Sequence, residues 1–163
     1  MPACALSANL DRMFWILFAV FLAACIAPIA SGALFQPGDW YERLSKPAWT
    51  PPDWAFPIVW SVLYVCMSAA AARIALLPET GLALALWSVQ ITLNTLWSGV
   101  FFGLRRMASA GIVVLALWLA VAGTMVAFWV RDPVAGGLMA PYLVWVTLAS
   151  ALNWTVWARN RVA

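Results

Sequence analysis

Amide and indole side chains are the groups in this 163-residue chain best suited to recognising a ligand. The chain has no histidine, which removes Ser-His-Asp and Cys-His catalysis, imidazole metal sites and His-ligated haem. The six Asp and Glu residues are scattered, and three cysteines form neither a disulfide framework nor a metal cluster. Gln90 and Asn94, in contrast, lie deep in an apolar run, and the chain has twelve tryptophans. We therefore expect binding through rings and a few hydrogen bonds, with no conventional catalysis, metal or required cofactor.

The composition excludes several classes of protein. Hydrophobic residues make up 66% of the chain and the mean hydropathy is +0.92. Asp, Glu, Lys and Arg make up only 9%, against about 25% in a soluble domain. The net charge of +3 comes from too few groups for a nucleic-acid-binding surface. These values indicate a membrane protein.

The charged residues divide the chain into uncharged runs of membrane-spanning length. A helix needs roughly 20 apolar residues to cross the hydrocarbon core of a bilayer. The five runs are 13–38, 54–72, 80–104, 107–130 and 133–158. We therefore predict an all-α integral membrane protein with one domain over residues 1–163. Its five transmembrane helices should lie near 13–34, 55–77, 82–103, 107–130 and 134–157, in an up-down bundle because three of the connections are very short.

The distribution of basic residues predicts the orientation. Cytoplasmic ends of membrane proteins carry an excess of Lys and Arg. One end of the predicted bundle has six basic residues, namely Arg43, Lys46, Arg105, Arg106, Arg159 and Arg161, and the other has Arg12, Arg73 and Arg131. The 35–53 loop and the C-terminus should therefore be cytoplasmic. The first run could be a signal peptide, but its apolar region is longer than usual and favours a retained helix.

The long connection at 35–53 is not a plain linker. A flexible linker is rich in Gly and Ser, whereas this loop holds Trp40, Tyr41 and Trp49 with prolines at 37, 47, 51 and 52. Prolines stiffen the loop and lower the entropy lost on ordering. Two interpretations stay open: the rings form an interfacial aromatic belt, or the loop covers a cavity at the end of the bundle.

Helical periodicity places amides and rings on shared faces. Gln90, Asn94, Trp97 and Phe101 share one face, and in other helices Trp60 shares a face with Tyr64 and Met67, and Trp145 with Tyr142, Ala149 and Asn153. Unpaired amides in lipid cost several kcal/mol, so these faces should point into the bundle. Such an interior suits a flat, apolar, aromatic ligand. The alternative is that the rings only fill the core.

Gly99 and Gly103 lie on roughly the opposite side of the same predicted helix and form a G-x-x-x-G pair. Such a pair lets two membrane helices approach closely. We predict a homodimer through this face, with packing inside one chain as the alternative.

The motifs resemble those of the tryptophan-rich sensory protein/translocator protein family (TspO, also called the peripheral benzodiazepine receptor). The stretch from Trp40 to Pro57 reads W-Y-x-x-L-x-K-P-x-W-x-P-P-x-W-x-F-P. It is followed by W-x-x-L-Y-x-x-M from Trp60, Q-x-x-x-N-x-x-W from Gln90, and P-Y-x-x-W from Pro141. The resemblance covers nearly all of 13–158.

The resemblance implies a bacterial membrane receptor or sensor that binds tetrapyrroles such as protoporphyrin IX and haem, with a role in their transport or metabolism. It implies a pocket below the first loop, with ligand-binding residues Tyr41, Pro51, Trp60, Asn94, Trp97, Trp145 and Ala149. As an alternative function it implies light- and oxygen-dependent porphyrin breakdown, with Trp40 and Trp145 as the catalytic residues. The inner membrane is expected, and the outer membrane stays open.

A sterol transporter is a further alternative that the resemblance implies. The cholesterol-recognition pattern of animal members needs a Tyr between Leu and Arg, whereas Trp154 stands at that place between Leu152 and Arg159. Such patterns are weak predictors even when intact. Sterol therefore ranks below porphyrin, and metal-free porphyrin ranks above haem because the chain offers no imidazole ligand.

Overall fold

A computed structural model describes residues 2–161, and this part of the chain contains helices and no strands, which confirms the all-α prediction. The helices are α1 (Pro2–Ala24), α2 (Ile26–Leu34), α3 (Asp39–Glu42), α4 (Ala55–Ala75), α5 (Gly81–Ser98), the π-helical turn η1 (Gly99–Gly103), α6 (Met107–Arg131) and α7 (Pro133–Asn160). Helices α4, α6 and α7 begin and end within three residues of the predicted bounds. The predicted 35–53 loop contains the short helix α3.

Four helical segments are long and apolar enough to cross a membrane: Asn9–Leu34, Ala55–Ala75, Met107–Arg131 and Pro133–Asn160. The remaining predicted span forms α5 and η1. It is not among these four segments, and α5 carries the polar residues Gln90, Thr92, Asn94 and Thr95. Length and apolarity thus support four of the five predicted spans, and the count of five stays a prediction.

Two of the predicted helices are interrupted. The first one breaks at Cys25, where Pro28 has no N–H for the carbonyl of Ala24 and its ring crowds that carbonyl. The third one ends in η1, where the amide N of Leu104 donates to the carbonyl of Gly99 over 2.8 Å. This wider i to i−5 turn shifts the side-chain register, so regular helical periodicity does not continue through Gly99–Gly103.

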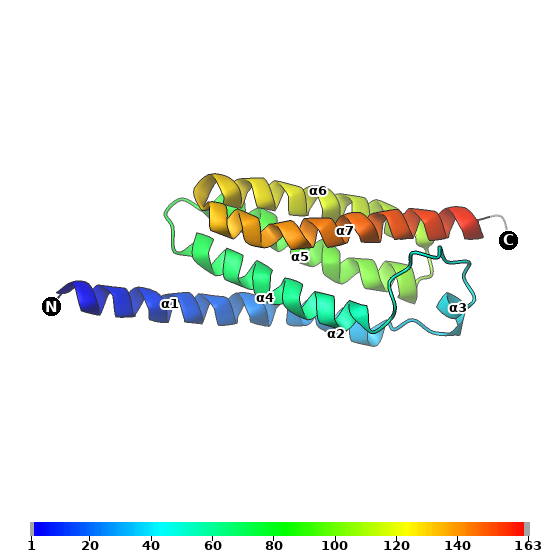
Figure 1. Ribbon diagram of the computed structural model, residues 1–163, viewed down its shortest axis with the longest axis horizontal. Coiled ribbons are helices and arrows are strands. Elements are labelled where there is room, and N and C mark those ends of the chain that lie inside the picture. The colour runs from blue at the N-terminus through cyan, green and yellow to red at the C-terminus, as the bar shows by residue number, and fades with distance from the viewer. Residues whose placement is uncertain (1, 162–163) are drawn as a thin grey trace.

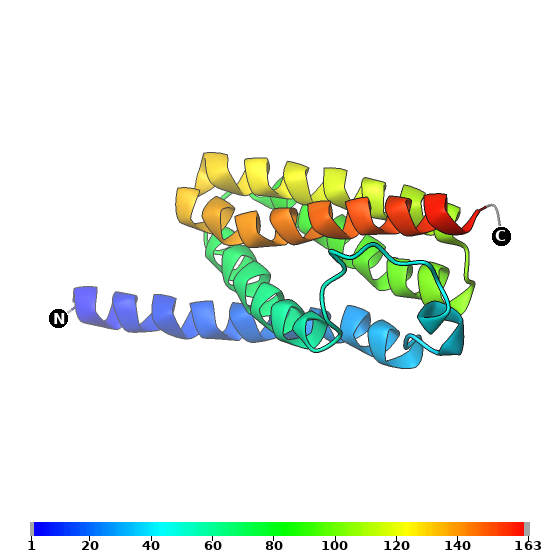
Figure 2. The same ribbon diagram turned by 45° about the vertical axis from the view of Figure 1, so that its right-hand side comes forward.

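The helices form an elongated bundle with the 35–53 loop at one end (Figure 1). Helix α4 packs between α1 and α7, α6 packs between α5 and α7, and α2 packs against α5. Helix α1 reaches beyond the other helices at the N-terminal end, whereas the loop and α3 lie near the C-terminal end of α7 (Figure 2). The loop is therefore placed over the ends of the helices that carry the predicted ligand-binding rings.

Tight packing joins α6 and α7 at the other end of the bundle. A Cβ on Gly136 would lie 2.6 Å from the Cα of Trp129, so only glycine fits there without a shift of the backbone. Asp132 caps α7, because its Oδ1 accepts from the backbone N of Val134 at 2.9 Å. Its Oδ2 accepts from Nε of Arg73 at 2.6 Å, which ties the end of α4 to this connection.

Candidate ligand-binding site

The 35–53 loop is folded onto the bundle. Tyr41 of α3 is only 8% exposed, and its ring meets Phe101 and Phe102 edge to face at centroid distances of 6.2 and 5.3 Å. Ser45 and the side chain of Asn160 exchange two hydrogen bonds of 2.9 and 3.2 Å, which tie the loop to the end of α7. The loop therefore packs over the end of the bundle, as the cover interpretation expects.

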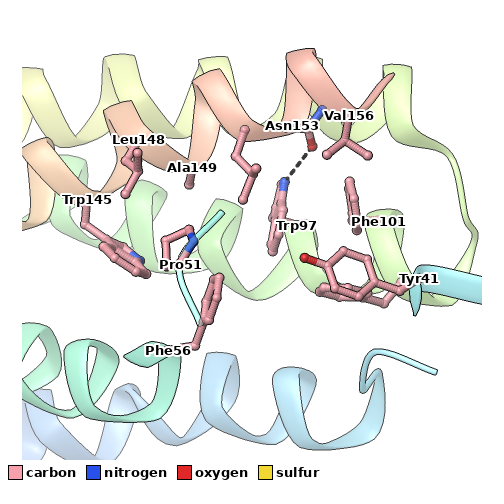
Figure 3. Close-up of a pocket in the computed structure, with 12 residues that line it drawn as sticks. Tyr41, Pro51, Phe56, Trp97, Phe101, Trp145, Leu148, Ala149, Asn153 and Val156 are labelled. Atoms are coloured by element: carbon pink, nitrogen blue, oxygen red, sulfur yellow. Dashed lines mark hydrogen bonds between the residues drawn. The ribbon is translucent and has the colours of Figure 1, made fainter. Parts of the chain in front are cut away.

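A small, almost wholly apolar cavity lies beneath the loop (Figure 3). Its volume is about 50 Å³. Its lining comes from the loop, the start of α4, α5 with η1, and α7: Tyr41, Pro51, Phe56, Trp97, Phe101, Phe102, Trp145, Leu148, Ala149, Leu152, Asn153 and Val156. Aromatic rings from four segments of the chain thus surround one space.

Trp97 is held in place on two sides. Its Nε1 donates to Oδ1 of Asn153 over 3.3 Å, the hydrogen bond drawn in Figure 3. Its ring stacks on Phe101 at 5.2 Å with an interplanar angle of 22°. Asn153 is fixed in turn, because its Nδ2 donates to the carbonyl of Met107 over 2.9 Å. Helices α5, α6 and α7 therefore position this indole together.

Trp145 forms the opposite side of the same cavity. Phe56 meets its ring edge to face at 5.5 Å with an interplanar angle of 73°. Ala149 follows one turn later on α7 and also lines the cavity, where its small side chain leaves room between the rings. In Figure 3 Trp145 of α7 and Phe56 of α4 lie close together, with the loop residue Pro51 beside them.

A second, larger hollow adjoins the first between α2, α4 and α5. Its volume is about 350 Å³, and its lining includes Trp60, Tyr64 and Asn94. The Nδ2 of Asn94 donates to the hydroxyl of Tyr142 over 3.1 Å, and Trp60 stacks on Tyr64 at 5.4 Å. Phe56 and Trp97 line both hollows and therefore form the partition between them.

Comparison of the sequence with those of known proteins shows the family of this chain. A model of the TspO/MBR family matches residues 15–158. The chain belongs to the TspO/MBR family. It is 51% identical over 149 residues to the tryptophan-rich sensory protein of Cereibacter sphaeroides, covering 91% of this chain and 94% of the relative. It is also 51% identical over 148 residues to Protein CrtK of Rhodobacter capsulatus, covering 88% and 92%. The translocator protein of Homo sapiens is 34% identical over 137 residues, covering 79% and 81%.

Family membership and the four apolar spans together establish a multi-pass membrane protein. The predicted ligand-binding residues of this TspO chain divide between the two hollows. The first cavity contains Tyr41, Pro51, Trp97, Trp145 and Ala149. The second contains Trp60 and Asn94 together with Trp97.

Trp40 lines neither hollow of the TspO site. It is half-buried and packs against η1, where its ring meets Phe101 edge to face at a centroid distance of 6.0 Å. Sequence reasoning missed Phe56, although it stands one helical turn before Trp60 inside the quoted loop motif. The i, i+4 spacing to a predicted ligand-binding residue was the available signal.

The two glycines of the predicted TspO dimer face contact their own chain. A Cβ on Gly103 would lie 2.7 Å from Cδ1 of Phe35, and one on Gly99 would lie 3.4 Å from Cε2 of the same ring. Phe35 follows α2 directly, so these glycines let the end of α2 approach η1 closely. The homodimer through this face stays a prediction.

The titratable group of this TspO cavity is Tyr41, which lies outside the membrane-spanning helices. Burial raises the pKa of its phenol above the ordinary value, and the negative charge of Asp53 raises it further. The hydroxyl is therefore protonated at neutral pH and can donate a hydrogen bond. In the part of the chain that the structure describes, no three His, Cys, Asp or Glu side chains gather as they would around a metal ion.

Proposed function

We propose that this TspO-family protein is a membrane receptor that binds tetrapyrroles, such as protoporphyrin IX and haem, in the cavity beneath the 35–53 loop. The observation that carries the proposal is the enclosure of one apolar space by Tyr41, Trp97 and Trp145 from three separate segments. Flat aromatic ligands gain from apolar burial and from ring contacts worth about 0.5–1.5 kcal/mol each. The names of the relatives, a sensory protein and a translocator protein, support a role in sensing or transport.

Binding of a tetrapyrrole requires the two hollows to join. The first cavity, at about 50 Å³, is far below the roughly 300–1,000 Å³ of small-molecule sites, whereas the adjoining hollow of about 350 Å³ falls within that range. Phe56 and Trp97 separate them, so rotation of these two rings would create one continuous site. In this proposal Trp60 and Asn94 contact the part of the ligand that extends toward α2.

The proposal includes a fifth membrane span formed by α5 and η1. Its two amides support this assignment because both point inward, with Gln90 fully buried and Asn94 paired with Tyr142. The excess of basic residues at the loop end supports a cytoplasmic loop and C-terminus. The helical fold supports a bacterial inner membrane. A homodimer through Gly99 and Gly103 would require Phe35 to form part of the interface or to move away from it.

Titration of the purified full-length protein with protoporphyrin IX tests the proposal, with the absorption band of the porphyrin as the readout. Trp145→Ala should weaken binding, since the indole lines the cavity. Trp15→Ala is the matched control, because that indole lies on α1 and is 64% exposed. Equal affinity of both variants and wild type would overturn the proposed site.

Light-dependent breakdown of porphyrin is a second candidate function, and the position of Trp145 favours it. An indole that lines the cavity can donate an electron to a bound, excited porphyrin, with molecular oxygen as the final oxidant. Trp40 is separated from the cavity by Phe101, so it could act only through that ring. Trp145→Phe should slow porphyrin loss under illumination more than Trp40→Phe does, and equal rates in both variants and wild type would exclude this function.

Sterol transport has weaker support. Trp154 packs closely against Gly111 of α6: a Cβ on this glycine would lie only 2.9 Å from Cζ2 of the indole. This ring is therefore engaged in helix packing. Cholesterol should compete with protoporphyrin IX only weakly in the same titration.

A further inference from the structure

A third hollow lies between α3, with the loop residues around it, and the end of η1. Figure 2 shows α3 at the loop end of the bundle. Its volume is about 360 Å³ and its surface is mostly polar, in contrast to the apolar cavity beneath the loop. The lining residues are Gln36, Gly38, Asp39, Trp40, Arg43, Phe102 and Arg105. Phe102 also lines the apolar cavity, so this ring borders both spaces.

Two guanidinium groups give this polar hollow its charge. Among the described residues the only salt bridge joins Arg73 and Asp132, so Arg43 and Arg105 are not neutralised by a carboxylate within ion-pair distance. Asp39 lines the same hollow, which leaves a net charge of one positive unit. Arginine presents a planar fork of donors that matches phosphate oxygens. The hollow therefore suits a singly charged anion with several acceptor oxygens.

The backbone holds Arg105 in an unusual conformation. Its φ of 56° lies in the left-handed region that a residue with a side chain rarely adopts. The turn around it is closed by hydrogen bonds from Leu104 to Gly99 and from Arg106 to Val100. Strained residues of this kind are concentrated at ligand-binding positions. Here the turn aims Arg105 at the hollow, with its guanidinium carbon 5.9 Å from the ring centre of Trp40.

The positions of Arg105 and Trp40 at the end of an apolar run indicate where the anion comes from. Arg105 follows directly after the uncharged run 80–104, and Trp40 beside it is half-buried, as tryptophans are at the boundary between lipid and water. At this boundary the phosphodiesters of lipid headgroups are the abundant anions, and basic pockets beside membrane helices bind them. A phosphodiester carries one negative charge, which matches the net charge of the hollow.

We propose that this hollow binds the headgroup of one anionic phospholipid of the phosphatidylglycerol class. Arg43 and Arg105 donate to its phosphodiester oxygens, while its acyl chains lie along the apolar surface of η1. The bound lipid would hold α3 and the residues beside it, in the loop that covers the apolar cavity. This site is separate from the proposed tetrapyrrole site and does not depend on it.

Native mass spectrometry of the full-length protein in detergent tests the proposal by counting bound lipids during titration with phosphatidylglycerol. The double variant Arg43→Gln/Arg105→Gln should lower the affinity of the tightest site at least tenfold. The double variant Arg106→Gln/Arg161→Gln is the control, because it removes the same charge from the same end of the protein outside the hollow. It should change that affinity less than twofold.

A charge variant and a comparison of ligands test the proposal further. Asp39→Asn removes a negative charge that repels the phosphodiester, and should strengthen phosphatidylglycerol binding. Phosphatidylcholine and inorganic phosphate should bind more weakly than phosphatidylglycerol. Equal losses of affinity in the two double variants would show that binding depends only on the overall surface charge, and would overturn the proposal. Equal binding of phosphatidylcholine, or displacement of the lipid by millimolar inorganic phosphate, would also overturn it.

Discussion

Trp97 and Asn153 are joined by a hydrogen bond of 3.3 Å from the indole N–H to the amide oxygen, which fixes the ring between the two hollows. Trp97→Phe would keep most of the ring and leave Oδ1 of buried Asn153 without its donor. An unsatisfied buried polar atom costs about 1–3 kcal/mol, so thermal unfolding in detergent should show a lower Tm. Asn153→Ala should lower the Tm further, because it also removes the bond to the carbonyl of Met107. Wild-type Tm values in both variants would contradict this role.

Phe56 separates the small cavity from the larger hollow, so Phe56→Ala should join them. The expected result is a severalfold faster association of protoporphyrin IX in stopped-flow absorbance, because one of the two obstructing rings is gone. Ile58→Ala is the control, since that side chain lies on the same helix and is 57% exposed. An association rate that is the same in Phe56→Ala and in the control would show that this ring does not limit entry.

Two glycines should respond in opposite directions to replacement by alanine. Gly136→Ala would place a Cβ 2.6 Å from the backbone of Trp129, and this clash should lower the free energy of unfolding by about 1–3 kcal/mol. Gly123→Ala would meet nothing closer than 4.0 Å, and should raise it by up to about 1 kcal/mol through helix propensity. Comparison of the two Tm values with wild type checks both signs. A Tm of Gly136→Ala at or above the wild-type value would contradict the close contact of α6 and α7 at this glycine.

Gln90 is fully buried, and neither its Nε2 nor its Oε1 has a hydrogen-bond partner in the described chain. Gln90→Leu should therefore raise the Tm, because an unpaired buried amide costs about 1–3 kcal/mol. Asn94→Leu should lower it, since Asn94 is paired with Tyr142. A lower Tm for Gln90→Leu would mean that the Gln90 amide has a stabilising partner in the native protein.

The ion pair at the far end of the bundle predicts a dependence of stability on pH. Burial disfavours the charged form of Asp132, but hydrogen bonds from Arg73 and two backbone N–H groups outweigh it and hold its pKa below the ordinary value. A lowered pKa stabilises the fold above the unfolded-state pKa of about 4, and this contribution is lost as pH falls through the folded-state value. The Tm difference between wild type and Asp132→Asn should therefore shrink between pH 7 and pH 3. A constant difference would show that the charge of Asp132 adds nothing.

The positions of charged residues were sufficient to locate most helices. Charge is costly inside a bilayer, so Arg73, Arg105 and Arg131 mark helix ends, and α4, α6 and α7 follow the prediction within three residues. Regular periodicity also placed Trp97 and Trp145 on faces that line one cavity.

The features that the sequence did not predict arise from local backbone geometry and long-range packing. Pro28 breaks the first helix, and η1 ends the regular period before Gly99, so a periodic projection could not anticipate that Phe35 covers Gly99 and Gly103. Trp40 and Tyr41 are neighbours with similar side chains. The single turn of α3 places only Tyr41 in the cavity. Composition and spacing do not separate the two residues, and only the family resemblance assigned Tyr41 to the pocket.

Filling the cavity without removing a ring tests the central claim most directly. Ala149 lines the cavity, whereas Ala151 lies on the same helix and is exposed on its outer surface. Leucine at either position adds the same volume to α7. Equilibrium titration with protoporphyrin IX should show loss of saturable binding in Ala149→Leu and wild-type binding in Ala151→Leu. Wild-type affinity in Ala149→Leu would contradict the claim that the ligand occupies the space between Trp97 and Trp145.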